Sequence, residues 1–263
     1  DLADPRFSEW RDTRSLWIVV RLTHLIGSGN SRPTLSSDQT FMRTLYHLSL
    51  SPFSRKVRVV LAEKQLDSTL KAEMVWDRRQ DFLALNPAGT VPVLVDEDGT
   101  VVVGSVAIAE YLDEVYVEPP MIPGTAGERA EVRRLVAWFD EKFDREVTTL
   151  LVGEKLMKRF LGLGEPDSTA IRAGHANIAT HLDYLDFLAE RRNWLAGDRF
   201  SLADVTAASH LSCVDYIGDV PWDRHPEAKA WYARVKSRPS FRSLLSDHIP
   251  GTRPPTHYAD LDF

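Results

Sequence analysis

Beyond residue 42, the first part of the chain alternates short apolar stretches with short helical segments. Four stretches of apolar and β-branched residues predict β-strands, namely residues 45–48, 70–76, 91–95 and 100–103. Apolar residues at helical spacing predict helices at residues 54–65 and 81–85 and in the segment that begins at Ser105, which is expected to cap its helix. The resulting order, β-α-β-α-β-β-α, predicts a compact mixed α/β domain.

A segment rich in proline and glycine, residues 118–124, separates this domain from a wholly helical second part. Apolar residues then recur every three or four positions and predict helices at residues 126–151, 170–191, 201–216 and 226–237. The third of these has a clear start, because Ser201 with Asp204 three residues later forms a capping box. Trp138 lies off the apolar stripe of the first helix, so it is expected to cover either another helix or another subunit.

Residues 1–41 look unlike the rest of the chain. Their one apolar run, residues 16–26, is interrupted by Arg21 and His24 and is too short and too charged to span a bilayer. We therefore predict that residues 1–41 are a flexible extension or a non-native upstream segment. The expected organisation of the remainder is an α/β domain at 42–118, a helical domain at 126–248 and an extended C-terminal peptide at 249–263.

The composition narrows the classes of function. The 263 residues carry a net charge of −6 and are 43% hydrophobic, which favours a globular cytoplasmic protein over a membrane protein or one that binds nucleic acid. The single cysteine, Cys213, excludes an internal disulfide and is expected in the core because its neighbours are apolar. His175 and His181 are six residues apart on one predicted helix, which does not fit paired metal ligands. No metal site is predicted.

Residues 86–94, Asn-Pro-Ala-Gly-Thr-Val-Pro-Val-Leu, form a predicted turn that leads into a buried strand. Pro92 is unusual there, because proline donates no hydrogen bond and restricts the residue before it. A cis Val91–Pro92 bond would turn the backbone N–H and C=O of Val91 outward, where they could hold an extended peptide. The alternative is an edge-strand proline without a ligand.

Several motifs, in order, resemble the glutathione S-transferase superfamily. They extend over residues 43–245 and comprise the strand, turn and helix of 45–61, the stretch 86–94, Ser-Val-Ala-Ile at 105–108, Phe-Ser-Leu-Ala-Asp at 200–204, and Trp231 followed by Arg-Pro-Ser-Phe at 238–241. This resemblance implies an N-terminal thioredoxin-like α/β domain followed by an all-α C-terminal bundle. It also implies a homodimer, for which Trp138 is a candidate contact.

The superfamily places glutathione across the thioredoxin-like domain. By motif, Val91 would hold the cysteinyl backbone of glutathione beside a cis Pro92, and Ser105 would meet the γ-glutamyl carboxylate at a helix N-terminus, where free N–H groups favour an anion. Many members carry an acidic residue before that serine, whereas this chain has Gly104. Loss of a charge-assisted hydrogen bond could cost about 1.5–3 kcal/mol, so glutathione binding is expected to be weak or absent.

Ser51 occupies the position at which serine-type members stabilise the thiolate of glutathione. A hydroxyl donor there would lower the pKa of the bound thiol, which is otherwise only a few per cent thiolate at neutral pH. The turn at 51–54, Ser-Pro-Phe-Ser, also resembles the Cys-Pro-x-Cys turn of thioredoxin-like oxidoreductases with oxygen in place of both sulfurs, which excludes disulfide exchange. The alternative is that Ser51 and Ser54 only cap the helix.

The chain ends in a proline-rich spacer followed by aromatic and acidic residues. Such a segment is typical of an exposed peptide for another protein; a tail folded onto its own domain is the alternative. With the motifs at 50–58, 75–79 and 129–147, it resembles the glutathione-transferase-like division proteins of alphaproteobacteria, which bind filaments of the tubulin homologue FtsZ. The partner-binding residues predicted from this resemblance are Tyr258, Asp260, Leu261, Asp262 and Phe263.

Two functions follow from these resemblances. The favoured one is a glutathione-transferase-like protein that binds and regulates FtsZ filaments in bacterial cell division. The alternative is a glutathione S-transferase that conjugates glutathione to a small electrophile. In the alternative, Ser51 is the catalytic residue, and glutathione contacts Val91, Pro92, Gly104 and Ser105.

Overall fold

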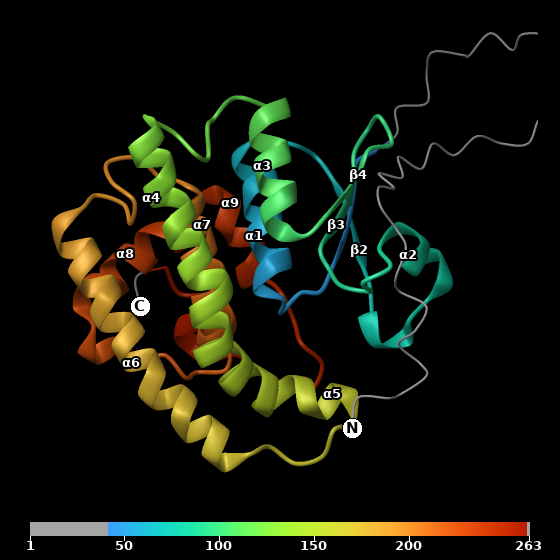
Figure 1. The fold of residues 1–263 in the computed structure, drawn as a ribbon. Helices are drawn as coiled ribbons and strands as arrows, with labels where there is room; N and C mark the ends of the chain where they lie inside the picture. The colour runs from blue at the N-terminus through green and yellow to red at the C-terminus, as the bar shows by residue number, and fades with distance from the viewer. Residues whose placement is uncertain (1–41, 262–263) are drawn as a thin grey trace, which may run out of the picture. The chain divides into compact units, whose positions relative to one another are not determined.

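The computed structural model describes residues 42–261, and its first domain is built on a four-stranded mixed sheet (Figure 1). The elements are β1 (Thr44–His47), α1 (Pro52–Glu63), β2 (Thr69–Ala72), α2 (Gln80–Leu85), β3 (Val93–Val95), β4 (Val101–Val103) and α3 (Ser105–Val115). The strand order is β2-β1-β3-β4; β1 and β2 are parallel, and β3 is antiparallel to both of its neighbours. The predicted thioredoxin-like domain is confirmed, whereas the predictions for residues 1–41 lie outside the described residues.

Helices α1 and α3 cover one face of this sheet, and α2 lies on the other (Figure 1). Leu45 of β1, Val60 of α1 and Leu112 of α3 have no exposed surface and belong to one apolar cluster. On the opposite face, the ring of Phe82 in α2 lies 5.6 Å from that of Tyr46. Leu45 and Tyr46 are adjacent in β1, and successive side chains of a strand point to opposite faces of the sheet. One strand therefore contributes an apolar side chain to each face.

The predicted second strand, residues 70–76, is shorter in the structure. It ends at Ala72 because the chain turns into a 3₁₀ helix, η2 (Val75–Asp77). Arg78 follows in the left-handed region with a φ of 45°, which closes the turn before α2.

The second domain is helical. Its elements are α4 (Ala126–Ala137), the π-helical segment η3 (Trp138–Met157), α5 (Lys158–Leu161), α6 (Ser168–Arg191), α7 (Leu202–Tyr216), η4 (Trp222–Arg224), α8 (Pro226–Lys236), α9 (Pro239–Leu245) and η5 (Thr256–Tyr258). Segments α4, η3 and α5 form one continuous helix. This helix extends beyond residue 151, where the sequence predicts its end, and stops where Gly162 adopts a φ of 64°. The sequence pattern does not predict α9 or η5.

Helix α7 is the centre of this domain, and all of its residues are buried. It packs against α4, η3 and α8, and α1 of the first domain packs against it as well (Figure 1). The predicted capping box is confirmed: Ser201 Oγ accepts from the N–H of Ala203, and the Asp204 carboxylate accepts from the N–H of Ser201 at 3.1 Å. Cys213 lies in α7 with no exposed surface, as predicted.

Trp138 covers another helix of the same chain. Its indole N–H donates to Nδ1 of His181 on α6 at 3.1 Å, and its ring lies 4.8 Å from the ring of Tyr184 on the same helix. The sequence leaves two partners open for Trp138, another helix or another subunit, and the structure shows the contact with another helix. The homodimer stays a prediction. No helix among residues 42–261 is long and apolar enough to cross a membrane.

Candidate functional site

Ser51 stands at the N-terminal cap of α1. Its backbone is extended (φ −83°, ψ 118°), and its Oγ accepts a hydrogen bond of 3.2 Å from the N–H of Ser54. A hydroxyl that accepts one hydrogen bond still has its own hydrogen to donate. The cap and the proposed thiolate donor therefore use different parts of one hydroxyl group, and the two interpretations of Ser51 are compatible.

The stretch 86–94 is held in place by the buried side chain of Asn86, whose Nδ2 donates to the C=O of Thr90 at 2.7 Å. The Val91–Pro92 bond is cis, as in the interpretation that has Val91 hold an extended peptide. The C=O of Pro92 accepts from the N–H of Gly104 at 3.1 Å, which ties the stretch to the start of α3. Val91 is half-buried at the edge of a cavity.

The start of α3 differs in detail from the prediction. Ser105 is the first helical residue rather than the cap; Gly104 occupies the cap position and has no side chain to bond the free N–H groups. Its φ of 88° lies in the left-handed region, which glycine adopts without strain and an acidic residue would not. This conformation explains why glycine suits position 104, and it leaves the backbone N–H groups of α3 without a side-chain cap.

An apolar cavity of about 750 Å³ lies between the two domains. The first domain contributes Leu50, Ser51, Phe53, Trp76 and Val91 to its wall, the helical domain contributes Thr148, Val152, Met157 and Phe160, and the C-terminal segment contributes His248, Ile249 and Pro250. Two residues predicted from the sequence, Ser51 and Val91, therefore meet at one cavity. Gly104 and Ser105 are outside its lining.

A buried ion pair next to this cavity joins α1 to the helical domain. The Lys56 ammonium is paired with the carboxylate of Asp140 on η3, and their side chains are only 1% and 9% exposed. Burial lowers the pKa of Lys56, and Asp140 opposes this shift. Burial also disfavours the charged form of Asp140, but His210 and Lys56 outweigh it and hold the pKa of that carboxyl below its usual range. The pair ties the first half of α1, which begins just after Ser51, to η3.

This ion pair is not predicted from the sequence. The signal was a run of cations, Arg55, Lys56 and Arg58, within a helix that is otherwise apolar on its inner face. All three are buried in the structure. Buried cations require partners, so the run indicates carboxylates nearby, but it does not identify them.

The C-terminal segment is anchored in the core by Tyr258, which has no exposed surface. Its hydroxyl accepts from Nη1 of the buried Arg55 at 3.0 Å and donates to the C=O of Leu244 at 3.2 Å. Its ring meets the ring of Tyr216 edge to face, with centroids 5.1 Å apart. The expectation of an exposed peptide is therefore wrong at Tyr258, because burial of the ring and two hydrogen bonds hold it inside the fold.

The residues after this anchor are more accessible. Asp260 is exposed and Leu261 is half-buried, while Asp262 and Phe263 lie outside the described residues. Of the predicted partner-binding residues, Tyr258 thus acts as an internal anchor and Asp260 lies at the surface. Their role toward a partner stays a prediction.

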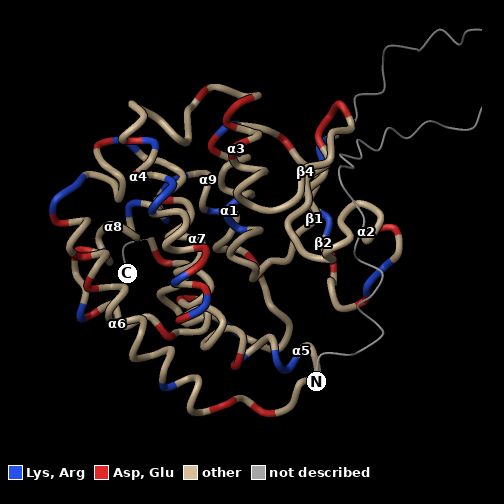
Figure 2. Tube along the Cα trace, viewed as in Figure 1, with Lys and Arg blue, Asp and Glu red and all other residues tan. Residues whose placement is uncertain are grey.

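Surface charges of both signs interleave along α4, η3 and α6 (Figure 2). Arg134 pairs with Glu131 three residues before it, and Lys142 pairs with Glu146 four residues after it. This pattern is typical of a solvated helix face.

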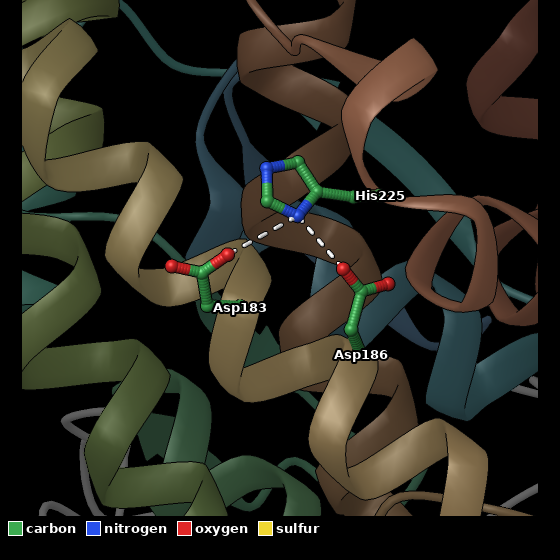
Figure 3. Close-up of side chains that lie close together, drawn as sticks. All are labelled: Asp183, Asp186 and His225. Atoms are coloured by element: carbon green, nitrogen blue, oxygen red, sulfur yellow. Dashed lines mark hydrogen bonds and ion pairs between the residues drawn. The ribbon is translucent and has the colours of Figure 1, made fainter.

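Asp183, Asp186 and His225 form a cluster of potential metal ligands between α6 and the start of α8 (Figure 3). Nδ1 of His225 lies 2.7 Å from Asp186 Oδ2 and 3.6 Å from Asp183 Oδ1. The other oxygen of Asp186 accepts from the N–H of Ala228 at 2.7 Å, in the first turn of α8. These contacts account for both oxygens of Asp186, so we interpret the cluster as a link between two helices.

The thioredoxin-like domain followed by a helical domain is the fold of the glutathione transferase class. Family models for the glutathione S-transferase N-terminal and C-terminal domains match residues 50–115 and 165–239. Glutathione S-transferase 3 of Zea mays is 31% identical, over 82% of this chain and 98% of the enzyme. The chain belongs to the glutathione S-transferase family.

Within the family, three comparisons cover most of this chain at 47% identity or more. It is 47% identical to FtsZ-localized protein A of Caulobacter vibrioides, over 84% of this chain and 98% of that protein. The solved structure of FzlA from C. crescentus superposes with a TM-score of 0.82, over 84% of this chain and 100% of that one. A glutathione S-transferase structure from Rhodospirillum rubrum F11 is 62% identical, with a TM-score of 0.83 and coverage of 84% and 100%.

Proposed function

We propose that the chain is a glutathione-transferase-like protein that binds and regulates FtsZ filaments in bacterial cell division. The observation that carries this proposal is the 47% identity to FtsZ-localized protein A over 98% of that protein. Proteins with a glutathione S-transferase name lie on both sides of this value, at 31% identity for the maize protein and 62% for the Rhodospirillum rubrum structure, so a transferase is kept as the second candidate. We also propose that the protein acts in the cytoplasm as a homodimer.

The C-terminal peptide is the proposed contact with FtsZ. Tyr258 fixes the peptide at one point, and Asp260, two residues later, is exposed. A peptide that is anchored close to its contact residues loses less conformational entropy when it binds than a free tail does. This supports a short recognition segment at residues 260–263, with Tyr258 as its internal support.

Removal of residues 260–263 is expected to abolish co-sedimentation with FtsZ polymer and to leave thermal unfolding unchanged, because the Tyr258 anchor is retained. Asp262→Lys should weaken co-sedimentation in the same direction, and Glu165→Lys, an equal charge change at an exposed site, should not. Undiminished co-sedimentation of the shortened chain would show that the tail is not the contact.

A second candidate function is glutathione conjugation. It is favoured by the apolar cavity, which has Ser51 and Val91 in its wall and room for an electrophile beside a bound thiol. Gly104 supplies no carboxylate for the γ-glutamyl ammonium group, so we propose weak glutathione binding at most. Calorimetric titration with millimolar glutathione measures this affinity directly.

Two substitutions of Ser51 separate its roles. Ser51→Ala and Ser51→Gly both remove the hydroxyl, so each is expected to lower the rate of glutathione conjugation about 10- to 100-fold, the worth of one charge-assisted hydrogen bond. Their stabilities should differ, because alanine at a helix cap costs about 1 kcal/mol and glycine only a few tenths. Conjugation of 1-chloro-2,4-dinitrobenzene and urea unfolding are the measurements. Equal conjugation rates in wild type and both variants would remove Ser51 from catalysis.

A further inference from the structure

A second cavity lies on the helical domain, beside the C-terminal segment. Its volume is about 460 Å³, and it shares no lining residue with the cavity between the two domains. Its wall is formed by η4 and the two residues before it, by Lys229 of α8 and by the C-terminal segment, including Asp260. We call it the tail pocket. The described part of the chain ends at Leu261, one residue after Asp260, so the last two residues begin next to this pocket.

Trp222 gives the tail pocket a fixed apolar surface. Its indole N–H donates to Oδ1 of Asp215 at 2.8 Å, and its ring stacks on the ring of Tyr232 with centroids 4.8 Å apart. Asp215 and Tyr232 have no exposed surface, so they hold the indole from the core side. Because its only N–H is committed to Asp215, Trp222 can offer the tail pocket only apolar ring surface. Val220 adds a second nearly buried apolar side chain to the wall.

The charges of the Arg, Lys and Asp side chains in the wall balance. Arg224 and Lys229 are positive, and Asp223 and Asp260 are negative, so the tail pocket has no preference for a strongly charged occupant. Cations beside an indole favour an aromatic side chain instead. An ammonium or guanidinium group is attracted to the face of an aromatic ring, and two aromatic rings attract each other edge to face or offset. The chemistry of the wall therefore fits an aromatic residue.

Phe263 is an aromatic residue within reach of the tail pocket. It follows Asp260 by three positions, and the two residues between them are not aromatic. An extended chain advances about 3.3–3.6 Å per residue, so the Cα atom of Phe263 cannot lie more than about 11 Å from that of Asp260. We propose that the ring of Phe263 occupies the tail pocket against Trp222 and gives the C-terminal peptide a second anchor after Tyr258.

The second anchor also sets the direction of Asp262. Successive side chains of an extended peptide point to opposite sides, so a Phe263 ring in the pocket turns the Asp262 carboxylate outward. The peptide between the two anchors then presents Asp262 to a basic surface of its partner. This step rests on the proposed FtsZ contact, whereas the docking of Phe263 does not. Phe263 is thus a positioning residue, and Asp262 is the contact.

The two anchors affect partner binding more than stability. A peptide held at both ends loses less conformational entropy when it binds than one held at Tyr258 alone. Partner affinity therefore depends on Phe263, although its ring faces the core. The free energy of unfolding depends on Phe263 little, because the gain from burying one ring is largely offset by the cost of ordering residues 261–263.

Fluorine NMR of the full chain with 4-fluorophenylalanine at position 263 tests the docking without FtsZ. The resonance is expected to be displaced from that of a free peptide of residues 256–263, because the ring of Trp222 lies against the label. Val220→Trp fills the tail pocket and should return the resonance to the free-peptide position, and Lys229→Glu should move it the same way. Arg242→Glu is the matched control, an equal charge change at an exposed site outside the wall, and should leave the resonance displaced.

Two results of this measurement would overturn the docking. One is a wild-type resonance at the free-peptide position, which would mean that the ring lies outside the pocket. The other is a displaced resonance that neither Val220→Trp nor Lys229→Glu changes, which would place the ring elsewhere on the surface. Circular dichroism shows whether each variant is folded, and Lys229→Glu keeps the test decisive if tryptophan at position 220 disturbs the core.

Co-sedimentation with FtsZ polymer tests the presentation of Asp262. Phe263→Ala is expected to weaken co-sedimentation about fivefold, the order of effect of leaving one side chain and its backbone unordered, and Phe263→Tyr, which keeps the ring, should restore it. Full co-sedimentation by Phe263→Ala, with a displaced wild-type resonance, would overturn the presentation of Asp262 and leave the docking. Absence of co-sedimentation by wild type would overturn the proposed function itself, and the fluorine resonance would still decide the docking.

Discussion

Replacing Asp140 with alanine is expected to lower the free energy of unfolding by about 3–5 kcal/mol, because it leaves the Lys56 ammonium buried without a counter-ion. The Lys56 side chain is 1% exposed and lies on α1, so it cannot reach water without moving the helix. The substitution also removes the acceptor of His210. Urea unfolding measures the loss, and the same change is expected to loosen the contact of α1 with the helical domain.

The matched control is the double variant Lys56→Met with Asp140→Leu. Replacing a whole buried ion pair by apolar groups is often neutral or stabilising, so the double variant should be much more stable than Asp140→Ala. If Asp140→Ala were as stable as wild type, the Lys56–Asp140 ion pair would contribute little to the free energy of unfolding.

The pH dependence gives an independent check of the same ion pair. The native pKa of Asp140 lies below its ordinary value of 3.8, so its contribution is complete above that value and is lost as the pH falls through the native pKa. The stability difference between wild type and Asp140→Ala should therefore shrink on acidification below about pH 4. A difference that grows in acid would contradict the assignment.

Elements in both domains could be predicted where their signals are local. The two-residue period of β1 and the breakers around Pro92 each act within a few residues, and so does the capping box at Ser201. The end of β2 could not be predicted in the same way, since Val75 and Trp76 are good strand formers in sequence. In the structure they turn into η2 and place Trp76 in the cavity wall.

The site could be predicted only where a motif carried it. Ser51 and Val91 belong to local motifs and meet at the cavity, whereas Thr148 carries no local signal. Its contact with His210 at 3.1 Å, and that of His210 with Asp140 at 3.3 Å, exist only because α7 packs against η3. Interactions between residues that are far apart in sequence depend on this packing. The periodicity of apolar residues along the chain does not predict them.

Tyr258→Ala is expected to lower the free energy of unfolding by about 3–5 kcal/mol, as for other large aromatic side chains removed from a core. Tyr258 has no exposed surface and holds the C-terminal segment against Arg55 and Tyr216. Burial raises the pKa of Tyr258 to about 12, so the hydroxyl stays protonated and can donate to Leu244. Urea unfolding measures the loss of stability.

The loss should be local as well as global. Ile249 and Pro250, which line the cavity, belong to the segment that Tyr258 anchors. Hydrogen exchange of residues 249–261 is therefore expected to rise more than exchange in α7, because α7 has partners on every side. Uniform acceleration over the whole chain would mean instead that Tyr258 supports the core without a separate role in the tail.

Tyr258→Phe is the matched control for these measurements. It keeps the ring against Tyr216 and removes the hydroxyl from Arg55 and Leu244, so it should cost only about 1–2 kcal/mol. If the anchored tail is the FtsZ contact, Tyr258→Ala should also weaken co-sedimentation with FtsZ polymer, and Tyr258→Phe should largely preserve it. Equal co-sedimentation by wild type and Tyr258→Ala, with exchange of the tail raised, would show that the anchor serves the cavity wall and not the partner.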